Sequence, residues 1–378
     1  MSRRWVVAVS GVLMASGALA AGVLASGSTA ASTPAWLAQV DATVAQGYKG
    51  VSMAAPTGGP KAASGKNVWN LACTLTIPDC ADASAGITSA GKALGWNITT
   101  VDNNTNPVTT GQQIQQAISA HADGIVVTGI DCPAIQNPLT AAKAAGIPVI
   151  VIGGQDCKPS LYTATTRIGG EPFETGQAGP YTKMRIDWAI AQKHGNLKMI
   201  VVNISDFSTV AGQTLTALQD LKVCPTCKVL DEINLSIQNL PALAQQLPAA
   251  LTQYPQANSL FLYSTSSLLT GAETAIKNAG RATGKNQIQI VGAGGTYGEP
   301  GLIRQGWNIG FTAFSENWEG WMALDFLNRL FHGVKASALP TVGVGIQLVD
   351  ATHNLPKGAS WSPPINYEAD YLKAWGVK

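Results

Sequence analysis

Acidic residues follow several predicted strands in the first half of the chain, where they could meet a ligand. Each stands close to a strand end: Asp79, Asp102, Asp131 and Asp156. Carboxylates around the mouth of a cleft could accept hydrogen bonds from a bound molecule. The alternative is that each side chain caps the following helix by accepting from the N–H groups of its first turn. Asp102 is the best candidate for a ligand or hinge contact.

Cys224-Pro-Thr-Cys227 has the CxxC spacing of redox enzymes. A redox CxxC places its first Cys at the N-terminus of a helix, where the helix dipole lowers the pKa of the thiol. Here the motif follows a predicted helix and precedes the predicted strand Val229–Leu235. It therefore lies in a turn, and we expect a structural disulfide rather than a redox site.

The chain contains six cysteines, and an even number of cysteines favours disulfides where a chain is exported. Cys132 and Cys157 follow neighbouring predicted strands, so their loops can meet at one edge of a parallel sheet. Closing that loop would stabilise the fold by roughly 3 kcal/mol in the chain-entropy model. Cys73 and Cys80 lie on either side of the first strand-to-helix turn. Other pairings stay open from the sequence alone.

Patterns for enzyme chemistry are weak. Gly292–Gly298 reads GAGGTYG after a predicted strand, but Tyr297 stands where GxGxxG needs its third Gly. The sequence has neither a GxxxxGK[ST] loop nor a GxSxG elbow. The four histidines are scattered, without a zinc-like spacing. We therefore expect a protein that is not an enzyme and that needs no cofactor and no metal.

Aromatic residues at predicted strand ends or on crossover segments could stack on a ligand. They are Phe207, Tyr263, Tyr297, Phe314 and Trp318. The alternative for each is packing within the core or between lobes.

Strands alternate with helical patterns along the chain, and this order predicts what positions the candidate residues. The first series, from Asn67 to Ile168, contains the segments NVWNLACTL, NITTVD, GIVVTG and IPVIVIGG. A second series begins near Glu171, and its first helix is expected over residues 175–194. Such alternation predicts an α/β fold with two doubly wound parallel-sheet lobes. Ligands bind on such sheets at the carboxyl ends of the strands, where the strand order reverses.

The bulk properties favour an exported two-domain protein. The chain has 378 residues and a net charge of +2, so nothing favours nucleic acid or an anionic membrane surface as a partner. Arg3 and Arg4 precede the uncharged apolar run Trp5–Ala25, and small residues follow. This pattern predicts a signal peptide over residues 1–31. An uncleaved membrane anchor is the alternative, because the apolar run is long.

The segments ALGWNITTVDNNTNP, AISAHADGIVVTGIDCPAI, AAKAAGIPVIVIGG and IVGAGGTYGEPGLIRQGWNIGFTAF carry a resemblance. On these segments the chain resembles the type I periplasmic solute-binding proteins of ABC importers, in their sugar-binding branch. The resemblance implies two lobes joined by a three-segment hinge that close on a ligand. It places residues 67–169 and 315–335 in lobe 1, and residues 170–314 and 336–378 in lobe 2. Residues 32–66 would form an N-terminal helix and a linker.

The sequence departs from the sugar-binding pattern where that family clamps sugar hydroxyls. The family's Asp-Arg pair falls on Gly153 and Gly154, a later Asp falls on Gly294, and a Gln of the last hinge segment falls on Phe314. Buried polar groups without partners cost about 1–3 kcal/mol each, so sugar hydroxyls need such clamps. We therefore expect a bulkier or less polar solute than a simple sugar.

The candidate ligand contacts combine strand-end residues with positions that match the family pattern. They are Ile77, Asp79, Asp102, Asp131, Gly154, Gln155, Phe207, Ile237, Tyr263, Thr265, Gly294, Tyr297 and Phe314. The implied function is that of a monomeric protein that captures a small molecule and delivers it to an ABC permease in the membrane. A sugar-binding protein, a ligand-sensing ectodomain and an exported enzyme with a dinucleotide-type fold are the alternatives. Import and sensing use the same closure, so the sequence does not separate them.

Overall fold

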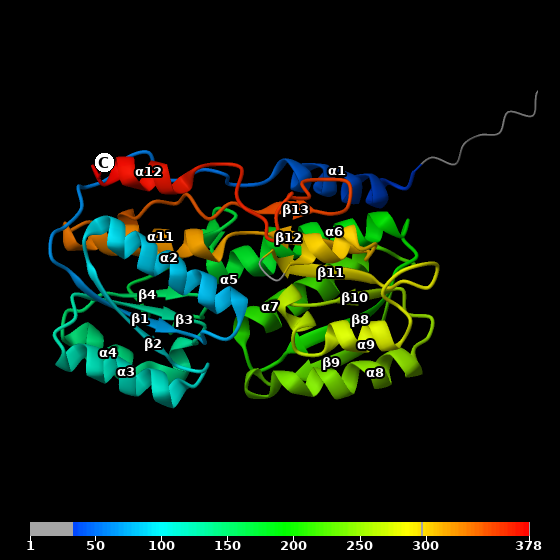
Figure 1. Ribbon diagram of the computed structural model, residues 1–378, viewed down its shortest axis with the longest axis horizontal. Coiled ribbons are helices and arrows are strands. Elements are labelled where there is room, and N and C mark those ends of the chain that lie inside the picture. Colours follow the sequence, from blue (N-terminus) through cyan, green and yellow to red (C-terminus); the bar gives the residue numbers. More distant parts are fainter. Residues whose placement is uncertain (1–32, 296–297, 378) are drawn as a thin grey trace, which may run out of the picture. The chain divides into compact units, whose positions relative to one another are not determined.

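The computed structural model describes residues 33–295 and 298–377, and Figure 1 shows their arrangement. Residues Ala35–Lys378 form one compact unit. The predicted signal peptide and Tyr297 lie outside the described residues. Among the residues that are described, no helix combines the length and apolar character that crossing a bilayer requires.

The first lobe contains a five-stranded sheet in the order β2-β1-β3-β4-β5, in which all paired strands are parallel. Two of its middle strands, Gly124–Thr128 and Val149–Ile152, are buried and mainly apolar along their whole length, as expected for strands covered on both faces. The strands are β1 (Asn67–Ala72), β2 (Asn97–Asp102), β3 (Gly124–Thr128), β4 (Val149–Ile152) and β5 (Ala164–Thr165). The order of the strands reverses between β1 and β3, which is where such sheets bind ligands.

The helices of the first lobe begin and end at sequence signals. α2 (Pro78–Leu94) ends at Gly95, which has a left-handed backbone. α3 (Pro107–Ser119) is capped by Asn106, whose side chain accepts from two amides of the first turn. The lobe also contains η1 (Cys132–Ile135) and α4 (Gln136–Ala144). A later helix, α11 (Glu316–Phe331), returns to this lobe and packs against α2.

The second lobe contains a six-stranded sheet in the order β13-β12-β11-β10-β8-β9. The strands are β8 (Lys198–Ile204), β9 (Lys228–Leu235), β10 (Ser259–Phe261), β11 (Gln289–Gly294), β12 (Ile309–Ala313) and β13 (Gln347–Val349). All pairs are parallel except β12 with β13. The helical segments are α6 (Thr182–Gln192), α7 (Ser208–Asp220), η3 (Leu221–Val223), η4 (Ile237–Ala242), α8 (Leu243–Gln253), η5 (Thr265–Leu268), α9 (Ala272–Asn278) and α10 (Glu299–Arg304).

Three crossover segments connect the lobes. The first contains the short hairpin β6 (Arg167–Ile168) and β7 (Glu171–Pro172). Val344 of the third segment lies beside it, because its N–H donates to the carbonyl of Arg167 at 2.8 Å. In the second segment, Phe314 donates to the carbonyl of Gly294 at 3.2 Å.

The helix expected over residues 175–194 is broken. It consists of α5 (Phe173–Gly176), a π-helical turn over Gln177–Tyr181, and α6. Gly179 has a non-helical backbone, and Pro180 follows it. Proline lacks the N–H group that a continuous helix needs, so the break follows from the sequence.

The first and last helices of the described residues pack on different lobes. α1 (Ala35–Lys49) packs against α6 and β13 of the second lobe, whereas α12 (Tyr367–Ala374) packs against α11 (Figure 1). Trp375, just after α12, stacks on Trp321 of α11 with ring centroids 5.4 Å apart. The last helix therefore differs from our expectation that residues 336–378 all belong to lobe 2. The short η6 (Ala336–Ala338) lies in the third crossover segment.

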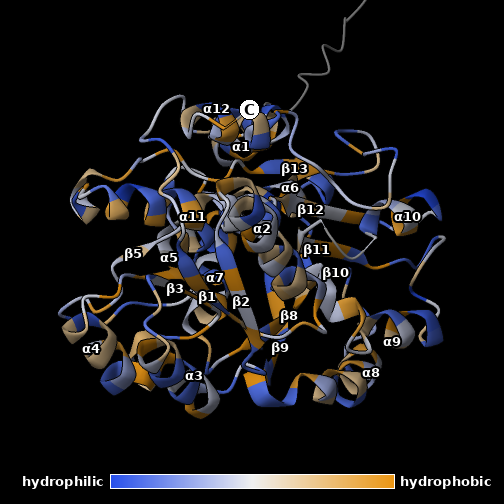
Figure 2. Ribbon diagram, turned by 60° about the vertical axis from the view of Figure 1, so that its left-hand side comes forward, coloured by the Kyte–Doolittle hydropathy of each residue, from blue (hydrophilic) through white to orange (hydrophobic). Residues whose placement is uncertain are grey.

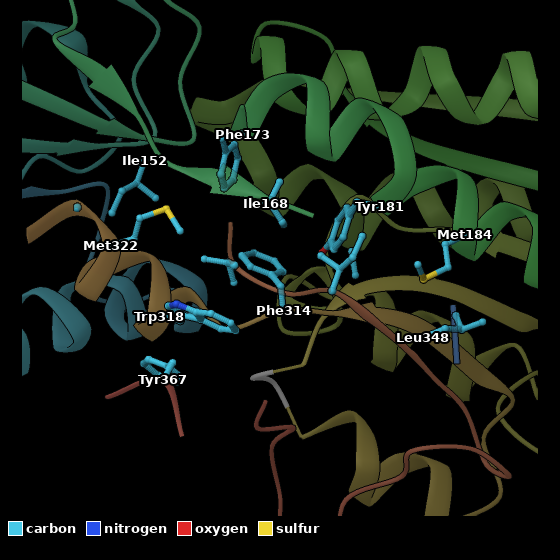
Figure 3. Close-up of a cluster of buried hydrophobic side chains, with 14 of the residues drawn as sticks. Ile152, Ile168, Phe173, Tyr181, Met184, Phe314, Trp318, Met322, Leu348 and Tyr367 are labelled. Carbon is cyan, nitrogen blue, oxygen red and sulfur yellow. The ribbon is translucent and has the colours of Figure 1, made fainter. Parts of the chain in front are cut away.

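The buried hydrophobic residues come from both sheets, whose strands are coloured orange over part of their length in Figure 2. One cluster runs from one lobe to the other through the crossover segments. Figure 3 shows part of it, with Ile152, Ile168, Phe314, Tyr181 and Leu348 among the labelled side chains. The crossover segments are therefore packed elements rather than loose linkers.

The structure contains three disulfides and confirms the expected pairings. They join Cys73 to Cys80, Cys132 to Cys157, and Cys224 to Cys227. The last pair lies in the turn between η3 and β9 and not at the N-terminus of a helix. The described residues contain no free cysteine.

Candidate functional site

A cavity of about 170 Å³ lies between the carboxyl ends of the two sheets. From the first lobe it is lined at or just after the ends of β1, β2, β3 and β4, by Cys73, Thr105, Thr128, Gly129, Ile152 and Gly153. From the second lobe it is lined at the corresponding ends of β8, β9, β10 and β11, by Ile204, Phe207, Ile237, Tyr263 and Gly294. This is the position at which parallel sheets bind ligands.

Most of the cavity wall is apolar. Its aromatic members are Phe173, Tyr181, Phe207, Tyr263 and Phe314, and its aliphatic members include Ile77, Ile152, Ile204, Val210, Ile237 and Leu240. Tyr181 meets Phe314 edge to face, with ring centroids 5.4 Å apart. Figure 3 shows both rings and Phe173 beside the crossover segments. An apolar cavity of about 150 Å³ holds a benzene molecule, so this cavity suits a solute built around one ring.

Carboxyl groups interrupt the apolar wall. Asp79, Glu316 and Glu319 line the cavity, whereas its lining includes no Lys, Arg or His among the described residues. Glu316 is 3% exposed and Glu319 is 1% exposed. Both belong to the first turns of α11. Residues three apart lie on one face of a helix, so both carboxyl groups can line the same cavity.

The two buried glutamates differ in their partners. Glu319 accepts a hydrogen bond from the hydroxyl of Thr166 at 3.2 Å. Neither carboxyl oxygen of Glu316 has a hydrogen-bonding partner among the described residues. Burial raises the pKa of both groups well above the ordinary value of 4.5, and for Glu316 the charges of Asp79 and Asp82 raise the pKa further. Burial also raises the pKa of Tyr263, to about 12.

A polar network supports the second-lobe wall. The amide of Gln213 donates to Gln177 at 2.6 Å, and both line the cavity. Arg185 lies behind them and donates to Gln213 and, at 3.0 Å, to the carbonyl of Leu262. Arg185 is fully buried, and burial lowers its pKa to about 10. The guanidinium therefore orients the two amides but does not line the cavity itself.

Hydrogen bonds join the lobes across the cleft. Asp131 of the first lobe accepts from the hydroxyl of Ser208 in the second lobe at 2.7 Å. Asp79 accepts from the hydroxyl of Ser264 at 2.8 Å. Gln238 donates to the carbonyl of Thr105 at 2.8 Å. These contacts correspond to a closed arrangement of the lobes.

The structure brings part of the predicted set to the cavity. The lining contains Ile77, Asp79, Phe207, Ile237, Tyr263, Gly294 and Phe314. The others that are described lie outside it: Asp102, Asp131, Gly154, Gln155 and Thr265. Whether any of these side chains contacts a ligand stays a prediction.

Three of the residues outside the lining, Asp102, Thr265 and Asp131, make hydrogen bonds within the protein. Asp102 accepts from the backbone N–H groups of Leu75 at 2.9 Å and Asn104 at 2.8 Å, so it fixes two loops. Thr265 donates to the carbonyl of Ala293 at 2.8 Å. Asp131 precedes η1 but makes no capping hydrogen bond there. Helix capping, the alternative considered for Asp131, is therefore wrong, because its carboxylate contacts Ser208 across the cleft.

Two glycines of the cleft are explained by the backbone. A Cβ atom on Gly154 would lie 2.3 Å from the carbonyl oxygen of Ile130. Gly294 has a φ of +113°, which side chains other than that of glycine rarely adopt. A side chain at Gly154 would therefore clash with the backbone of Ile130, and one at Gly294 would strain its own backbone.

Sequence reasoning missed Glu316, Glu319, Gln177, Gln213 and Tyr181. Four of them, Glu316, Glu319, Gln177 and Tyr181, follow crossover segments, whereas Gln213 lies in α7, which follows β8 within the second lobe. For Glu316 a signal was available, because it comes just after β12, at a strand end like those that identified the acidic candidates. For the glutamines the sequence carries no comparable signal.

Comparison with known proteins identifies the family. Residues 75–335, more than half of the chain, match the family described as periplasmic binding protein domain. No curated protein matches the sequence.

Solved structures share the fold. A galactofuranose binding protein is 16% identical with a TM-score of 0.66, over 82% of this chain and 99% of that one. A sugar ABC transporter protein from Yersinia enterocolitica is 16% identical with a TM-score of 0.65, over 82% of this chain and 94% of that one. A 5-methylthioribose transporter solute binding protein from Thermotoga lettingae is 16% identical with a TM-score of 0.64, over 83% and 93%.

These likenesses confirm the α/β fold with two lobes of the type I class. The family is one of exported proteins that bind small molecules, which agrees with the expectation that this chain is not an enzyme. The chain belongs to the periplasmic binding protein family.

Proposed function

We propose that this protein captures a small solute between its lobes and delivers it, as a monomer, to a membrane permease of an ABC importer. The solute is about the size of one ring and is less polar than a simple sugar. The observation that carries this proposal is the cavity of about 170 Å³ at the carboxyl ends of both sheets, with its aromatic and aliphatic wall.

The residues that line the cavity support a solute that is less polar than a simple sugar. A simple sugar presents hydroxyl groups on every side, and each needs a partner when it is buried. Five aromatic side chains occupy much of the wall, namely Phe173, Tyr181, Phe207, Tyr263 and Phe314. Such a wall suits a ligand with an apolar body and few polar groups, because ligand pockets of this kind fix orientation through a small number of polar contacts.

The contacts across the cleft support capture by closure. The bonds from Ser208 to Asp131 and from Ser264 to Asp79 exist only when the lobes are together. A ligand that touches both walls shifts the balance towards this state, because a ligand favours the conformation that it binds more tightly. The same closure would present the loaded form to a permease.

A thermal-shift screen of the mature protein tests the proposal. The panel contains simple sugars, polyols, aromatic acids, sterol fragments and small aromatic alcohols and amines. A compound at about 100 times its dissociation constant should stabilise the protein by roughly 2.7 kcal/mol. We expect shifts from compounds with one apolar ring. Shifts from simple sugars alone would contradict the polarity that we propose.

Phe314→Leu tests whether the cavity is the site. Phe314 is 6% exposed, so Ala would cost about 3 kcal/mol of stability and would confuse binding with folding. Leu keeps most of the volume but removes the ring. We expect about tenfold weaker binding of any compound found in the screen, measured by calorimetry. Phe331→Leu, a partly buried ring outside the cavity lining, is the control and should leave affinity unchanged.

A further inference from the structure

The charged side chains that line the cavity are carboxyl groups. Asp79, Glu316 and Glu319 line it, and its lining includes no Lys, Arg or His among the described residues. Arg185 lies behind the wall, where its guanidinium is engaged by Gln213, the carbonyl of Leu262 and the ring of Phe261. The space that the solute fills is therefore acidic.

Glu316 is exceptional among the buried carboxyl groups of the described chain. Glu319 has Thr166 as a partner, Glu299 accepts from the N–H of Gly298 at 3.0 Å, and Asp187 pairs with Lys183 at 2.8 Å. No other residue in the described part of the chain hydrogen bonds to either carboxyl oxygen of Glu316, although the residue is only 3% exposed. A buried polar group without a partner costs free energy, so such a group in a binding cavity indicates a partner that arrives with the ligand.

A metal ion does not suit this position. No group of three or more His, Cys, Asp or Glu in the described part of the chain could hold a metal ion. Asp79 and Glu319 already accept hydrogen bonds from Ser264 and Thr166. Glu316 alone is left to balance a charge, which fits one positive group on an organic molecule.

The aromatic wall fits the same kind of ligand. Phe314 and Tyr181 meet edge to face, and both line the cavity with Glu316. Aromatic faces attract organic cations through the electrons of the ring, and they also cover an apolar body. We infer that the solute is an organic monocation of about one ring's size, whose ammonium lies beside Glu316 and whose apolar body contacts Phe314 and Tyr181. This inference rests on the proposed function.

Binding of a cation should release a proton. The acidic groups around Glu316 are Asp79 and Asp82 on α2 and Glu319 on α11, and Arg185 lies beyond Tyr181. Burial and the charges of Asp79 and Asp82 raise the pKa of Glu316, so the cavity without a ligand favours the protonated form of this carboxyl group. An ammonium beside it favours the charged form, so the proton leaves as the amine binds.

The experiment compares matched probes. Phenethylamine and benzylamine are tested against 2-phenylethanol and benzyl alcohol, which replace the ammonium with a hydroxyl, and against ribose. Calorimetry near neutral pH in phosphate and in Tris reports both the affinity and the number of protons released. We expect each amine to bind at least tenfold more tightly than its alcohol, with release of about one proton.

Glu316→Gln removes the charge and keeps the shape. In this variant we expect amine affinity to fall at least tenfold and proton release to disappear, while alcohol affinity stays within about twofold. Glu368→Gln, an exposed glutamate on α12, is the matched control. The unfolding temperature of each variant shows that it is folded, and the comparison of amine with alcohol in the wild type does not depend on any variant.

Each outcome decides between the two proposals. Equal affinity for amine and alcohol, or an unchanged amine affinity in Glu316→Gln, overturns the inference. If alcohols or ribose bind while no amine does, the inference falls but solute capture stands. If no amine, alcohol or sugar binds, both the inference and the proposed function are set aside.

Discussion

The two ends of α11 carry buried carboxyl groups that differ in their surroundings. At its N-terminal end Glu316 is 3% exposed, and neither of its oxygens has a partner among the described residues. Nearer the C-terminal end Asp325 is 0% exposed, and it accepts from Arg329 at 2.7 Å and from the indole of Trp375 at 2.8 Å. Burial raises the pKa of both groups. Glu316 and Asp325 are therefore alike in burial and in the direction of their pKa shift, but they differ in their hydrogen-bonding partners.

The difference indicates two roles for one helix. Asp325 ties α11 to the end of the chain through Trp375, and to the N-terminal linker through Arg329, which donates to the carbonyl of Gly58 at 2.6 Å. Glu316 lines the cavity, and its carboxyl group connects α11 to no other element among the described residues. A carboxyl group with its hydrogen bonds made stabilises the fold, whereas one without partners costs stability until a ligand supplies them.

Removing the carboxyl group of Asp325, which accepts two hydrogen bonds, should lower the free energy of unfolding the most. Asp325→Ala removes the acceptor of the Nε–H of Arg329 and of the indole N–H of Trp375. Breaking a buried pair by removing one partner costs about 3–5 kcal/mol, so we expect the free energy of unfolding to fall by about 3 kcal/mol. Urea denaturation measures this loss. Glu368→Ala on the exposed side of α12 is the control, and a comparable loss there would remove the contrast.

The fold could be predicted because its signals are local. The glycines at 95 and 146 end helices, and the uninterrupted apolar run of β4 indicates a strand covered on both faces. The break in the helix after Phe173 was missed, although Pro180 marks it. The packing of α12 on α11 depends on contacts between distant tryptophans, which no local pattern reveals.

The candidate site could be predicted only in part. Asp79, Tyr263 and Phe314 were found because they follow strands, and parallel strands place their carboxyl ends together. Glu316 and Glu319 were missed because a glutamate in the first turn of a helix usually lies in solvent near the helix N-terminus. Their burial depends on α11 returning from the second lobe to pack on α2, which is a tertiary event.

The stability of the protein should fall with rising pH because of Glu316. Its folded pKa lies above the ordinary 4.5, so at intermediate pH the folded state keeps a proton that the unfolded chain releases. The contribution of the protonated Glu316 to the free energy of unfolding is complete below about pH 4.5. It is lost as the pH rises through the pKa that Glu316 has in the folded state. One such proton corresponds to about 1.4 kcal/mol per pH unit.

Glu316→Gln isolates this slope. Urea denaturation between about pH 5 and about pH 8 should show a smaller fall in the free energy of unfolding for the variant than for the wild type. Asp123 and Asp350 have lowered pKa values and therefore titrate below this range. Identical slopes in the two proteins would mean that Glu316 is charged in the empty cavity, and the contrast with Asp325 would lose its electrostatic basis.

Glu319 lies between the two extremes, since it has one partner, and it offers the finest test of the comparison. Thr166 is fully buried, and its hydroxyl donates to Glu319 at 3.2 Å. Thr166→Val keeps the shape but removes that donor, so the free energy of unfolding should fall by about 1 kcal/mol. Glu319 would then resemble Glu316, and the fall of stability with rising pH should become steeper, because the hydrogen bond favours the charged form.

Thr252→Val on the exposed face of α8 should change neither quantity, since its hydroxyl only donates within its own helix. A steeper slope without a loss of stability would show that Thr166 tunes the charge of Glu319 but does not support the fold.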